Sequence, residues 1–234
     1  IMIKTKKNKN ISIVAFDADD TLWKELDLYV QYKQRFYHIL KHYYSENQAA
    51  HLLHQKERKN IPFYGCGLKS ITLSMIETLC DADTVTNSLC IKEIITYGKM
   101  MTKQPVELLD GVLDVLQELQ SNYKLALVTK GDLLDQQRKI KKSGLEKYFS
   151  HIEIMSDKQV HDYQVLFDKL ACNPSDFIMV GNSIMSDILP VLKLGGYAIY
   201  VPYHLVWEQE RYNDEFSHPN LIKIAKIREI LNYL

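Results

Sequence analysis

The sequence predicts an α/β protein, a doubly wound parallel sheet that carries an inserted all-helical cap. Three observations predict it. Strand-like runs are continuously apolar, not alternating, as expected for strands covered on both faces; they span 11–16, 124–128, 177–180 and 197–201. Helical patterns separate these runs from about residue 110 onward. Between the first run and Pro105, no strand pattern interrupts a series of helical segments.

The segment after the first strand is predicted to be four helices. Aromatic and apolar residues spaced by three and four form a stripe on the first helix: Tyr29, Tyr32, Phe36, Ile39 and Tyr43. We expect this stripe to be a bundle core. A capping box at 45–48 begins the second helix, a third follows the glycine-containing stretch 62–67, and a fourth spans roughly 84–101. We therefore expect a helical cap over 24–104, carried by an α/β domain made of 1–23 and 105–234.

The remaining elements alternate as a doubly wound fold requires. Apolar residues at helical spacing predict helices near 112–119 and 163–170, and a weaker apolar run at 151–155 predicts a further strand. Ile224, Ile227, Leu231 and Leu234 lie in line and predict a C-terminal helix. That helix either docks on the sheet domain or forms a dimer seam.

Composition excludes several classes of function. The 234 residues carry 29 basic and 29 acidic side chains, so no bulk positive charge favours binding to nucleic acid or to an anionic membrane. No apolar stretch is long enough to span a bilayer, and the Lys-rich start lacks the pattern of a signal peptide. The four cysteines form no CxxC pair, which indicates reduced thiols and a cytoplasmic location.

Three polar clusters each begin where a predicted strand ends. They are Asp17-Ala18-Asp19-Asp20-Thr21, Thr129-Lys130-Gly131-Asp132, and the run from Gly181 to Asp187. Ligands of open α/β sheets bind outside the carboxyl ends of the strands. We therefore expect the three clusters to converge at one crevice.

The residue types in these clusters suit one chemistry. Asp17 and Asp19 place two carboxylates close together, so that one can attack as a nucleophile and the other can serve as an acid. Asp187 adds a third carboxylate, and hard oxygen ligands of this kind suit Mg²⁺. Thr129 offers a hydroxyl, Gly131 allows close approach of the backbone, and Lys158 can offset the charge of an anionic substrate. Together these groups describe phosphoryl transfer.

At this point the sequence resembles a known family, the haloacid dehalogenase-like (HAD) hydrolases. The run FDADDTLW at 16–23 resembles their DxDxT signature, LVTKGD at 127–132 their second motif, Lys158 their third and GNSIMSD at 181–187 their fourth. The order and spacing agree from residue 11 to about residue 202, and the insert resembles the helical cap of subfamily I. The ordered set of four is far more specific than any one motif.

The resemblance implies a role for each motif residue. Asp17 would form an aspartyl-phosphate, and Asp19 would protonate the leaving group and then activate water. Thr129 and Lys158 would hold the phosphoryl oxygens. Mg²⁺ would be bound by the Asp17 carboxylate, the Asp19 carbonyl and Asp187. A member that cleaves carbon–halogen bonds needs no acid two residues after the nucleophile, so Asp19 favours a phosphatase over a dehalogenase.

Two positions depart from the commonest family pattern. Asp20 stands where many relatives have Gly, and we expect it to be a solvated turn residue. Asn182 stands where many have a second acidic residue, and it would hydrogen-bond a metal-bound water from just outside the ligand set.

Other candidates for substrate binding remain open between two interpretations. Lys130 either contacts the substrate together with Gly131 or lies on the loop surface. Tyr64 and Lys69 lie in the most irregular part of the insert. They either bind the leaving group of the substrate or belong to a simple connection between two helices.

The sequence thus predicts a Mg²⁺-dependent phosphatase that acts on a small phosphorylated metabolite. A phosphomutase acting on a sugar phosphate is the first alternative. A 2-haloacid dehalogenase and a non-catalytic protein that binds a partner are the others. The pattern does not indicate which phosphomonoester is the substrate or what the oligomeric state is.

Overall fold

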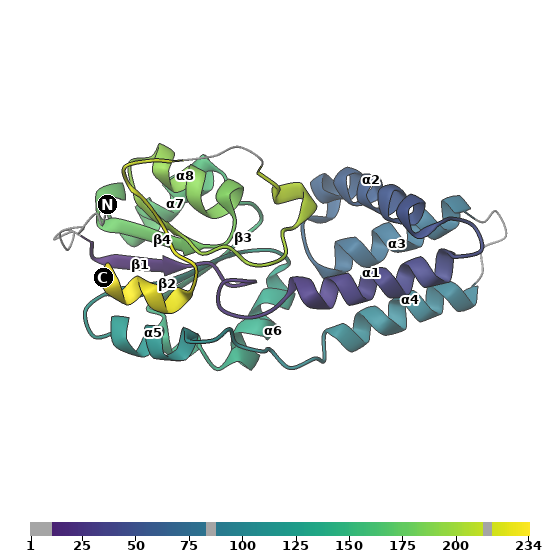
Figure 1. Ribbon diagram of the computed structural model, residues 1–234, viewed down its shortest axis with the longest axis horizontal. Coiled ribbons are helices and arrows are strands. Elements are labelled where there is room, and N and C mark those ends of the chain that lie inside the picture. Colours follow the sequence, from purple (N-terminus) through teal and green to yellow (C-terminus); the bar gives the residue numbers. More distant parts are fainter. Residues whose placement is uncertain (1–10, 83–87, 213–216) are drawn as a thin grey trace.

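A computed structural model describes residues 11–82, 88–212 and 217–234. Its centre is a parallel sheet of six strands in the order β3-β2-β1-β4-β5-β6, which confirms the predicted fold class (Figure 1). The strands are β1 (Ile13–Phe16), β2 (Lys124–Lys130), β3 (His151–Met155), β4 (Phe177–Gly181), β5 (Tyr197–Tyr200) and β6 (Leu221–Lys223). The order changes direction at β1, where the crevice of a doubly wound sheet forms.

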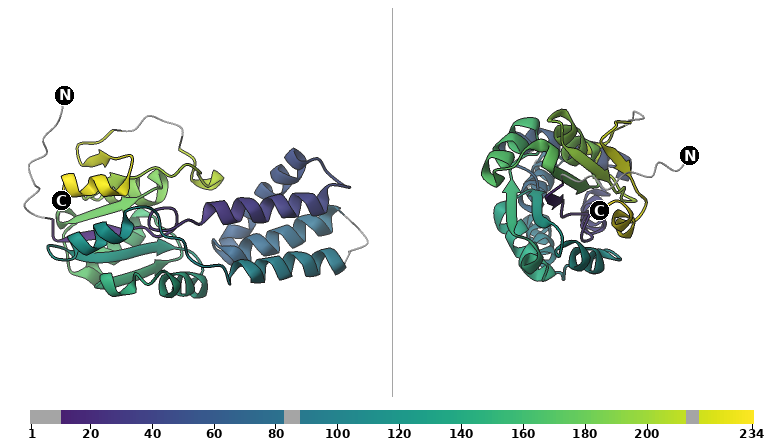
Figure 2. Two further views of the ribbon diagram at one scale, coloured as in Figure 1. Left: turned by 60° about the horizontal axis from the view of Figure 1, so that its bottom comes forward. Right: turned by 90° about the vertical axis from the view of Figure 1, so that its left-hand side faces the viewer.

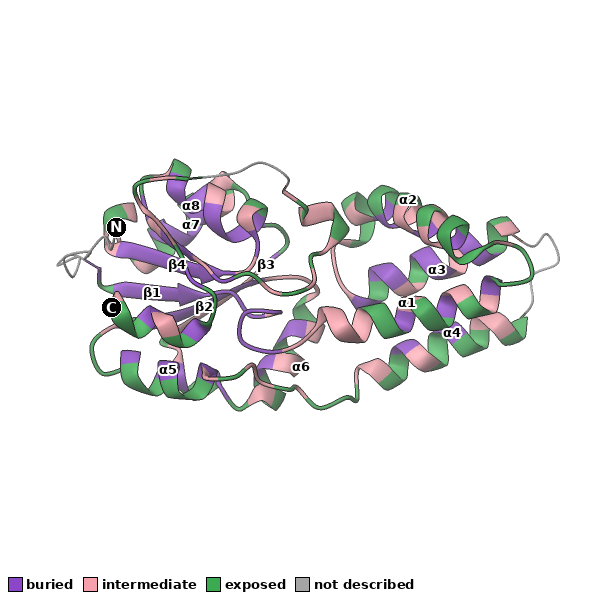
Figure 3. Ribbon diagram, in the orientation of Figure 1, coloured by how far each residue is buried: buried purple, intermediate pink, exposed green. Residues whose placement is uncertain are grey.

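Both faces of the sheet are covered, which explains the continuous apolar runs. In β1, Val14 and Phe16 pack into one apolar cluster and Ile13 and Ala15 into another. Figure 3 shows the central strands β1 and β4 buried along their length. Helices α5 (Val112–Leu119) and α6 (Leu133–Ser143) contribute to the first cluster, and α7 (Val160–Leu170) and α8 (Leu189–Lys193) to the second.

The insert is a separate layer of four helices that lie side by side (Figure 2). They are α1 (Leu26–Leu40), α2 (Glu46–Tyr64), α3 (Leu68–Ala82) and α4 (Ser88–Met101). The insert has its own apolar cluster, in which Tyr32 and Phe36 of the aromatic stripe are buried. Tyr43 lies beyond the end of α1 and is exposed, so the stripe is a core only along the helix itself.

Local signals set the helix boundaries in the insert. The predicted capping box is present, because Ser45 Oγ accepts from the Gln48 N–H and the Gln48 side chain accepts from the Ser45 N–H. The second helix extends further than expected, through Pro62 to Tyr64, and ends where Gly65 adopts a φ of 69°. The fourth helix is described from Ser88, and 83–87, part of its expected start, lie outside the described residues.

The C-terminal prediction is partly wrong. Residues Leu221–Lys223 form the edge strand β6, and a 3₁₀-helix follows at Ile227–Asn232 in place of an α-helix. Ile227 and Ile230, three residues apart, are buried as this tighter helix requires, whereas Leu231 is exposed. The expected docking on the sheet domain is confirmed, because Ile227 and Ile230 belong to the sheet cluster.

Two further findings concern the chain as a whole. All four cysteines are free thiols, as predicted. Among the helices in the described part of the chain, none has the length and apolar character that a membrane crossing requires.

Candidate active site

The predicted polar clusters converge at the carboxyl ends of the strands. Asp17 directly follows β1, Thr129 lies near the end of β2, and the loops after β3 and β4 supply Lys158 and Asp187. All four side chains line one cavity. The Asp17 N–H donates to the Val180 carbonyl at 2.8 Å, which fixes this first loop against the end of β4.

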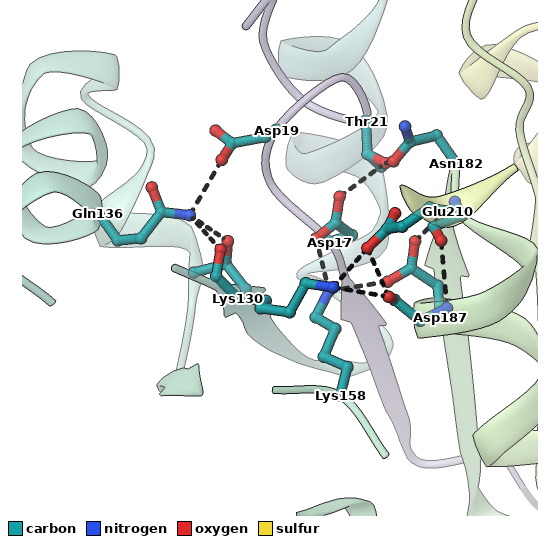
Figure 4. A network of polar contacts seen from close by, with 12 residues as sticks. Asp17, Asp19, Thr21, Lys130, Gln136, Lys158, Asn182, Asp187 and Glu210 are labelled. Carbon is teal, nitrogen blue, oxygen red and sulfur yellow. Dashed lines mark hydrogen bonds and ion pairs between the residues drawn. The ribbon is translucent and has the colours of Figure 1, made fainter. Parts of the chain in front are cut away.

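A buried ion triad forms the centre of the site. Lys158 Nζ lies 2.5 Å from Asp17 Oδ1 and 2.7 Å from Asp187 Oδ1, and Figure 4 shows the three groups in contact. Lys158 and Asp187 are each only 1% exposed. Burial alone would lower the pKa of the Lys158 ammonium, but the two carboxylates outweigh this effect and raise it well above its usual range. Lys158 is therefore a fixed positive charge.

The pKa of the Asp17 carboxyl is raised above its usual value. Burial raises the pKa of its carboxyl, and repulsion by Asp187 raises it further, while Lys158 opposes both effects. Burial likewise raises the pKa of Asp187, and the positive charge of Lys158 opposes this rise. One ammonium is thus shared between two carboxylates that lie out of water, and additional positive charge there would stabilise both.

Asp187 is held by an unusual backbone. It lies in a π-helical turn at Ile184–Ile188, and its Oδ2 accepts from the Ser183 N–H at 2.9 Å. Gly181 at the end of β4 leaves room for this carboxylate, because a Cβ there would lie 2.2 Å from Asp187 Oδ2. The predicted fourth motif therefore positions Asp187 through its glycine as well as through its acid.

Asp19 points to one side of the triad (Figure 4). Lys139 Nζ lies 2.7 Å from both of its carboxylate oxygens, and Gln136 Nε2 and Trp23 Nε1 donate to it at 3.0 and 2.7 Å. Its side chain is therefore separate from the Asp17–Asp187 pair. A carboxylate beside Asp17, with its own set of partners, can act on a different atom of a bound substrate.

Lys139 and Glu25 are site residues that the sequence does not predict. Lys139 lies on α6, and its Nζ also pairs with Glu25 at 3.0 Å. Burial would lower the pKa of Lys139, but Asp19 and Glu25 overcome this and raise it. Burial also raises the pKa of Glu25 to about 7, against the opposing Lys139. Because only Gln136 and Ile140 of α6 are buried, the apolar period that would reveal this helix is weak.

Thr129 and Gly131 lie where the sequence predicts. The Thr129 hydroxyl is buried and accepts from Gln136 Nε2 at 2.6 Å. Gly131 adopts a φ of 149°, and a Cβ there would contact the Gln136 side chain at 3.4 Å. The Gly131 N–H donates to the Met155 carbonyl at 3.1 Å, so this amide already has a partner within the fold.

The expectation for Asp20 is wrong. Its carboxylate is buried and accepts from the backbone N–H groups of Glu25 and Leu26 at 2.9 and 3.1 Å, at the start of α1. Its φ of 60° lies in the left-handed region, a conformation that favours glycine. Asp20 therefore links the loop after β1 to the first helix of the insert.

Asn182 contacts Asp17, the predicted nucleophile. Its side-chain amide lies within 3.2 Å of Asp17 Oδ2, the Asp19 carbonyl and Thr21 Oγ1, and the amide nitrogen faces these acceptors in the orientation that satisfies them. Thr21 Oγ1 also lies 3.2 Å from Asp17 Oδ2. Asn182 thus supplies a neutral donor where an acidic residue would repel Asp17.

Lys130 is partly buried, with its side chain 14% exposed, and does not lie on the loop surface. Its Nζ pairs with Glu210, donates to Ser186 Oγ at 3.0 Å and lies 5.5 Å from the centre of the Trp207 ring. Glu210 comes from the segment between β5 and β6, accepts from Ser186 Oγ at 2.6 Å, and raises the pKa of Asp187 by repulsion, an effect smaller than burial. Lys130 pairs with this carboxylate at the cavity wall and brings no unpaired charge to the cavity.

Tyr64 and Lys69 are not brought to the cavity lining. Lys69 Nζ pairs with Asp132 at 2.9 Å, a contact between the insert and the sheet domain, and its side chain is otherwise exposed. Tyr64 is half exposed and contacts Phe63. Their neighbours Gly65, Cys66 and Gly67 line the cavity instead.

The donor set can be compared with what Mg²⁺ requires. In the part of the chain that the structure describes, no three Asp, Glu, His or Cys side chains form a metal cluster. The predicted set needs only two side chains, Asp17 and Asp187, together with the Asp19 carbonyl. These are hard oxygen donors. The one positive charge of Lys158 compensates only one of the two negative carboxylates, so one negative charge remains uncompensated. The residues present therefore fit a hydrated Mg²⁺ ion.

Comparison with known proteins agrees with this geometry. The family model described as haloacid dehalogenase-like hydrolase matches residues 14–199, which include all four motifs. A curated mouse (Mus musculus) protein, N-acylneuraminate-9-phosphatase, is 31% identical over 114 residues, which are 47% of this chain and 46% of that protein. The matched region thus spans about half the length of this relative.

Two solved structures extend the likeness over the whole fold. A haloacid dehalogenase-like family hydrolase from Xanthomonas campestris superposes with a TM-score of 0.84 at 34% identity, covering 94% of this chain and 88% of the other. The HAD-hydrolase YfnB from Bacillus subtilis, described as bound to magnesium, has a TM-score of 0.67 at 16% identity and covers 94% and 97%. At that identity it supports the fold alone. The match over most of the chain, with the four motifs at the strand ends, shows that the chain belongs to the haloacid dehalogenase-like hydrolases.

Proposed function

We propose that the protein is a Mg²⁺-dependent phosphatase that cleaves a small phosphomonoester through an aspartyl-phosphate on Asp17. The observation that carries the proposal is the buried Asp17–Lys158–Asp187 triad, with Asp19 beside it on separate partners. A nucleophilic carboxylate, a fixed cation and a second carboxylate are the groups that phosphoryl transfer through a covalent intermediate needs.

The reaction would proceed in two steps. In the first, a carboxylate oxygen of Asp17 bonds to phosphorus, the ester bond breaks, and Asp19 gives its proton to the leaving oxygen. In the second, Asp19 takes a proton from water, which attacks phosphorus and releases inorganic phosphate and free Asp17. Lys158 and the Thr129 hydroxyl would hold the phosphoryl oxygens, and Gln136 orients Thr129 through its 2.6 Å hydrogen bond.

Mg²⁺ is the proposed cofactor, held by Asp17, Asp187 and the Asp19 carbonyl. When bound, it would offset the negative charge of the phosphoryl group and of the two carboxylates. The Asn182 side chain is neutral, so Asp17 and Asp187 would be the two acidic side chains that bind the ion.

We further propose that residues 24–104 act as the cap of a core made of 1–23 and 105–234. The cavity is lined from both sides, by strand-end residues such as Asp17 and by Ile61 and Ile71 of the insert. A cap of this kind excludes water from the reaction and contacts the leaving group. We propose a cytoplasmic location as well, in which the free thiols stay reduced.

The alternatives differ in where the phosphoryl group or halide goes. A phosphomutase would return the phosphoryl group to a sugar. A 2-haloacid dehalogenase would use Asp17 but not Asp19, so the well-ordered Asp19 favours the phosphatase. The partial likeness to N-acylneuraminate-9-phosphatase also favours a phosphatase and makes that enzyme's named substrate one compound to test.

A substrate panel tests this proposal. The purified chain is assayed with p-nitrophenyl phosphate, several sugar phosphates, an N-acylneuraminate 9-phosphate and 2-chloropropionate, with Mg²⁺ and with EDTA. We expect release of inorganic phosphate that EDTA abolishes, and no release of halide. Halide release without added metal would identify a dehalogenase, a rearranged sugar phosphate a mutase, and the lack of any turnover a non-catalytic protein.

A further inference from the structure

An apolar surface inside the cavity belongs to no core of the protein. The cavity encloses about 310 Å³ and extends from Asp17 at the sheet to α1 and α2 of the insert. Six residues line it without belonging to any apolar cluster that the described part of the chain forms: Leu26, Val30, Ile61, Leu205, Val206 and Trp207. Because no core of the protein buries this surface, a molecule bound in the cavity can remove it from water.

Three of these residues come from one connection of the sheet domain. Leu205, Val206 and Trp207 are consecutive and lie between β5 and β6, in a segment that Figure 1 shows beside the insert. None of the three is fully buried. Connections are ordinarily polar, and a run of exposed apolar residues in one of them normally has a function. Lining the cavity is the function that the structure indicates for this run.

The Trp207 ring is held at the wall of the cavity. Lys130 Nζ, which pairs with Glu210, lies 5.5 Å from the centre of the ring. The Glu210 N–H donates to the Trp207 carbonyl at 2.8 Å. Between these two residues, the Gln209 side chain donates to Glu57 of α2 at 3.3 Å. The segment is thus fixed both to the sheet domain and to the insert, which keeps the indole in the cavity lining.

The basic side chains that line the cavity are already paired. All four in the described lining lie within 3.0 Å of a carboxylate oxygen: Lys33, Lys130, Lys139 and Lys158. A second anionic group on the substrate would therefore find no unpaired ammonium. A cationic group would find the carboxylates beside Lys33 and Lys130 already compensated. Either kind of charge would lose its water without gaining a partner, so the leaving group is expected to be uncharged.

Uncharged leaving groups differ in what they require from the cavity. A hydroxyl group placed against the six apolar residues would lose its hydrogen bonds to water without replacement. An apolar group has no such loss, and an aromatic ring gains more than an aliphatic group does by packing against an indole. Because Trp207 is one of the six residues, the lining favours an aromatic ring.

We propose that the substrate is a phosphate ester whose leaving group is uncharged and carries an aromatic ring, and that Trp207 determines this specificity. The inference rests on the phosphatase activity proposed above and names the substrate class of that site. With the phosphoryl group at Asp17, the ring of the leaving group would pack against the Trp207 indole. Leu26 and Ile61 would contact the ring from the insert.

The test compares four esters of primary alcohols, which differ in the groups that the leaving alcohol carries. With Mg²⁺ and the full chain, kcat and KM are measured for benzyl phosphate, glycerol 1-phosphate, 2-phosphoglycolate and O-phosphoethanolamine. We expect kcat/KM for benzyl phosphate to be at least about tenfold above that for each of the other three, because only the benzyl ring covers the apolar surface. An equal or higher kcat/KM for any of the other three would overturn the inference.

Variants then assign the preference to Trp207. Trp207→Ala removes the ring, and Trp207→Phe restores an aromatic ring at the same position. Trp207→Leu removes the ring but keeps apolar bulk, so that a folded protein remains if the alanine variant does not fold. Phe63→Ala is the matched control, since Phe63 is an aromatic residue of the insert that is 80% exposed and lies outside the cavity lining.

We expect the ratio of kcat/KM for benzyl phosphate to that for glycerol 1-phosphate to fall about tenfold in Trp207→Ala and about threefold in Trp207→Leu, mainly through KM. The ratio should stay close to the wild-type value in Trp207→Phe and in the control. An unchanged ratio in the folded alanine or leucine variant, or an equal fall in Phe63→Ala, would overturn the inference. Failure of the phosphatase proposal is told apart from this result, because it removes phosphate release from all four esters in the wild-type protein.

Discussion

Lys139 Nζ lies 2.7 Å from both carboxylate oxygens of Asp19, although 120 residues of chain separate the two. The same ammonium pairs with Glu25 at the start of the insert. Helix α6 therefore links Asp19 to Glu25, which immediately precedes the first helix of the insert. Because Asp19 is held on this side, Lys158 is the ammonium that contacts the Asp17–Asp187 pair.

Replacement of Lys139 tests this link. In Lys139→Met, the part-buried carboxylates of Asp19 and Glu25 lose their shared cation. We expect the free energy of unfolding to fall by about 2 kcal/mol, less than for a fully buried pair, together with a lower kcat. Denaturant titration measures the first quantity and steady-state kinetics the second. Lys142→Met, on the same helix, is the control, because Lys142 is exposed and donates to the backbone carbonyls of Thr102 and Gln104, not to a carboxylate of the site. Equal effects of the two variants would refute the link.

Asp20 gives a pH dependence of stability with a definite sign. Burial raises the pKa of its carboxyl from 3.8 to about 7, although the N–H groups of Glu25 and Leu26 oppose this rise. The folded protein therefore binds this proton more tightly than the unfolded chain does. The stability that results is fully present below pH about 4 and is lost as pH rises to about 7.

The variant Asp20→Asn removes this titration but keeps an acceptor oxygen and a residue that tolerates positive φ. We expect the variant to gain stability relative to the wild-type protein between pH 5 and pH 8, as measured by denaturant unfolding at both values. A difference between the two proteins that is the same at pH 5 and pH 8, or that changes in the opposite direction, would contradict the expectation.

Mg²⁺ is expected to stabilise the folded protein. Asp17 and Asp187 are buried and share one ammonium, so a divalent cation would relieve their repulsion. At a Mg²⁺ concentration of about 100 times Kd, the free energy of unfolding would rise by about 2.7 kcal/mol. Thermal unfolding with MgCl₂, against KCl at equal ionic strength, measures the effect. The shift should vanish in Asp187→Asn and persist in Asp157→Asn, whose carboxylate is half exposed. Persistence in Asp187→Asn would place the ion elsewhere.

The strand ends were the predictable part of this protein. Asp17, Thr129, Lys158 and Asp187 could be assigned because each follows or ends an apolar strand, and parallel strands bring such residues to one edge. The bundle core at Tyr32 and Phe36 followed from helical spacing in the same way. The apolar strand runs, the helical spacing and the polar clusters at the strand ends therefore predicted the fold and the residues at the floor of the cavity.

The residues around that floor could not be predicted because tertiary packing places them. Lys139 lies on a polar helix without a clear apolar period, and Glu210 lies in a connection with no regular pattern. Asp20 was misjudged because its positive φ and its two backbone donors depend on where α1 begins. The irregular stretch of sequence around Tyr64 and Lys69 predicts a cavity wall, but the residues of this stretch that line the cavity are Gly65, Cys66 and Gly67.

The central claim is that Asp17 becomes phosphorylated during turnover, and trapping that intermediate tests it most directly. Enzyme mixed with excess phosphate ester and Mg²⁺ is quenched in acid within one turnover and digested, and its peptides are weighed. We predict that the peptide containing Asp17 gains the mass of one phosphoryl group, and that Asp17→Asn shows neither this gain nor EDTA-sensitive release of phosphate. A phosphorylated peptide that lacks Asp17, or metal-dependent turnover by Asp17→Asn, would contradict the account.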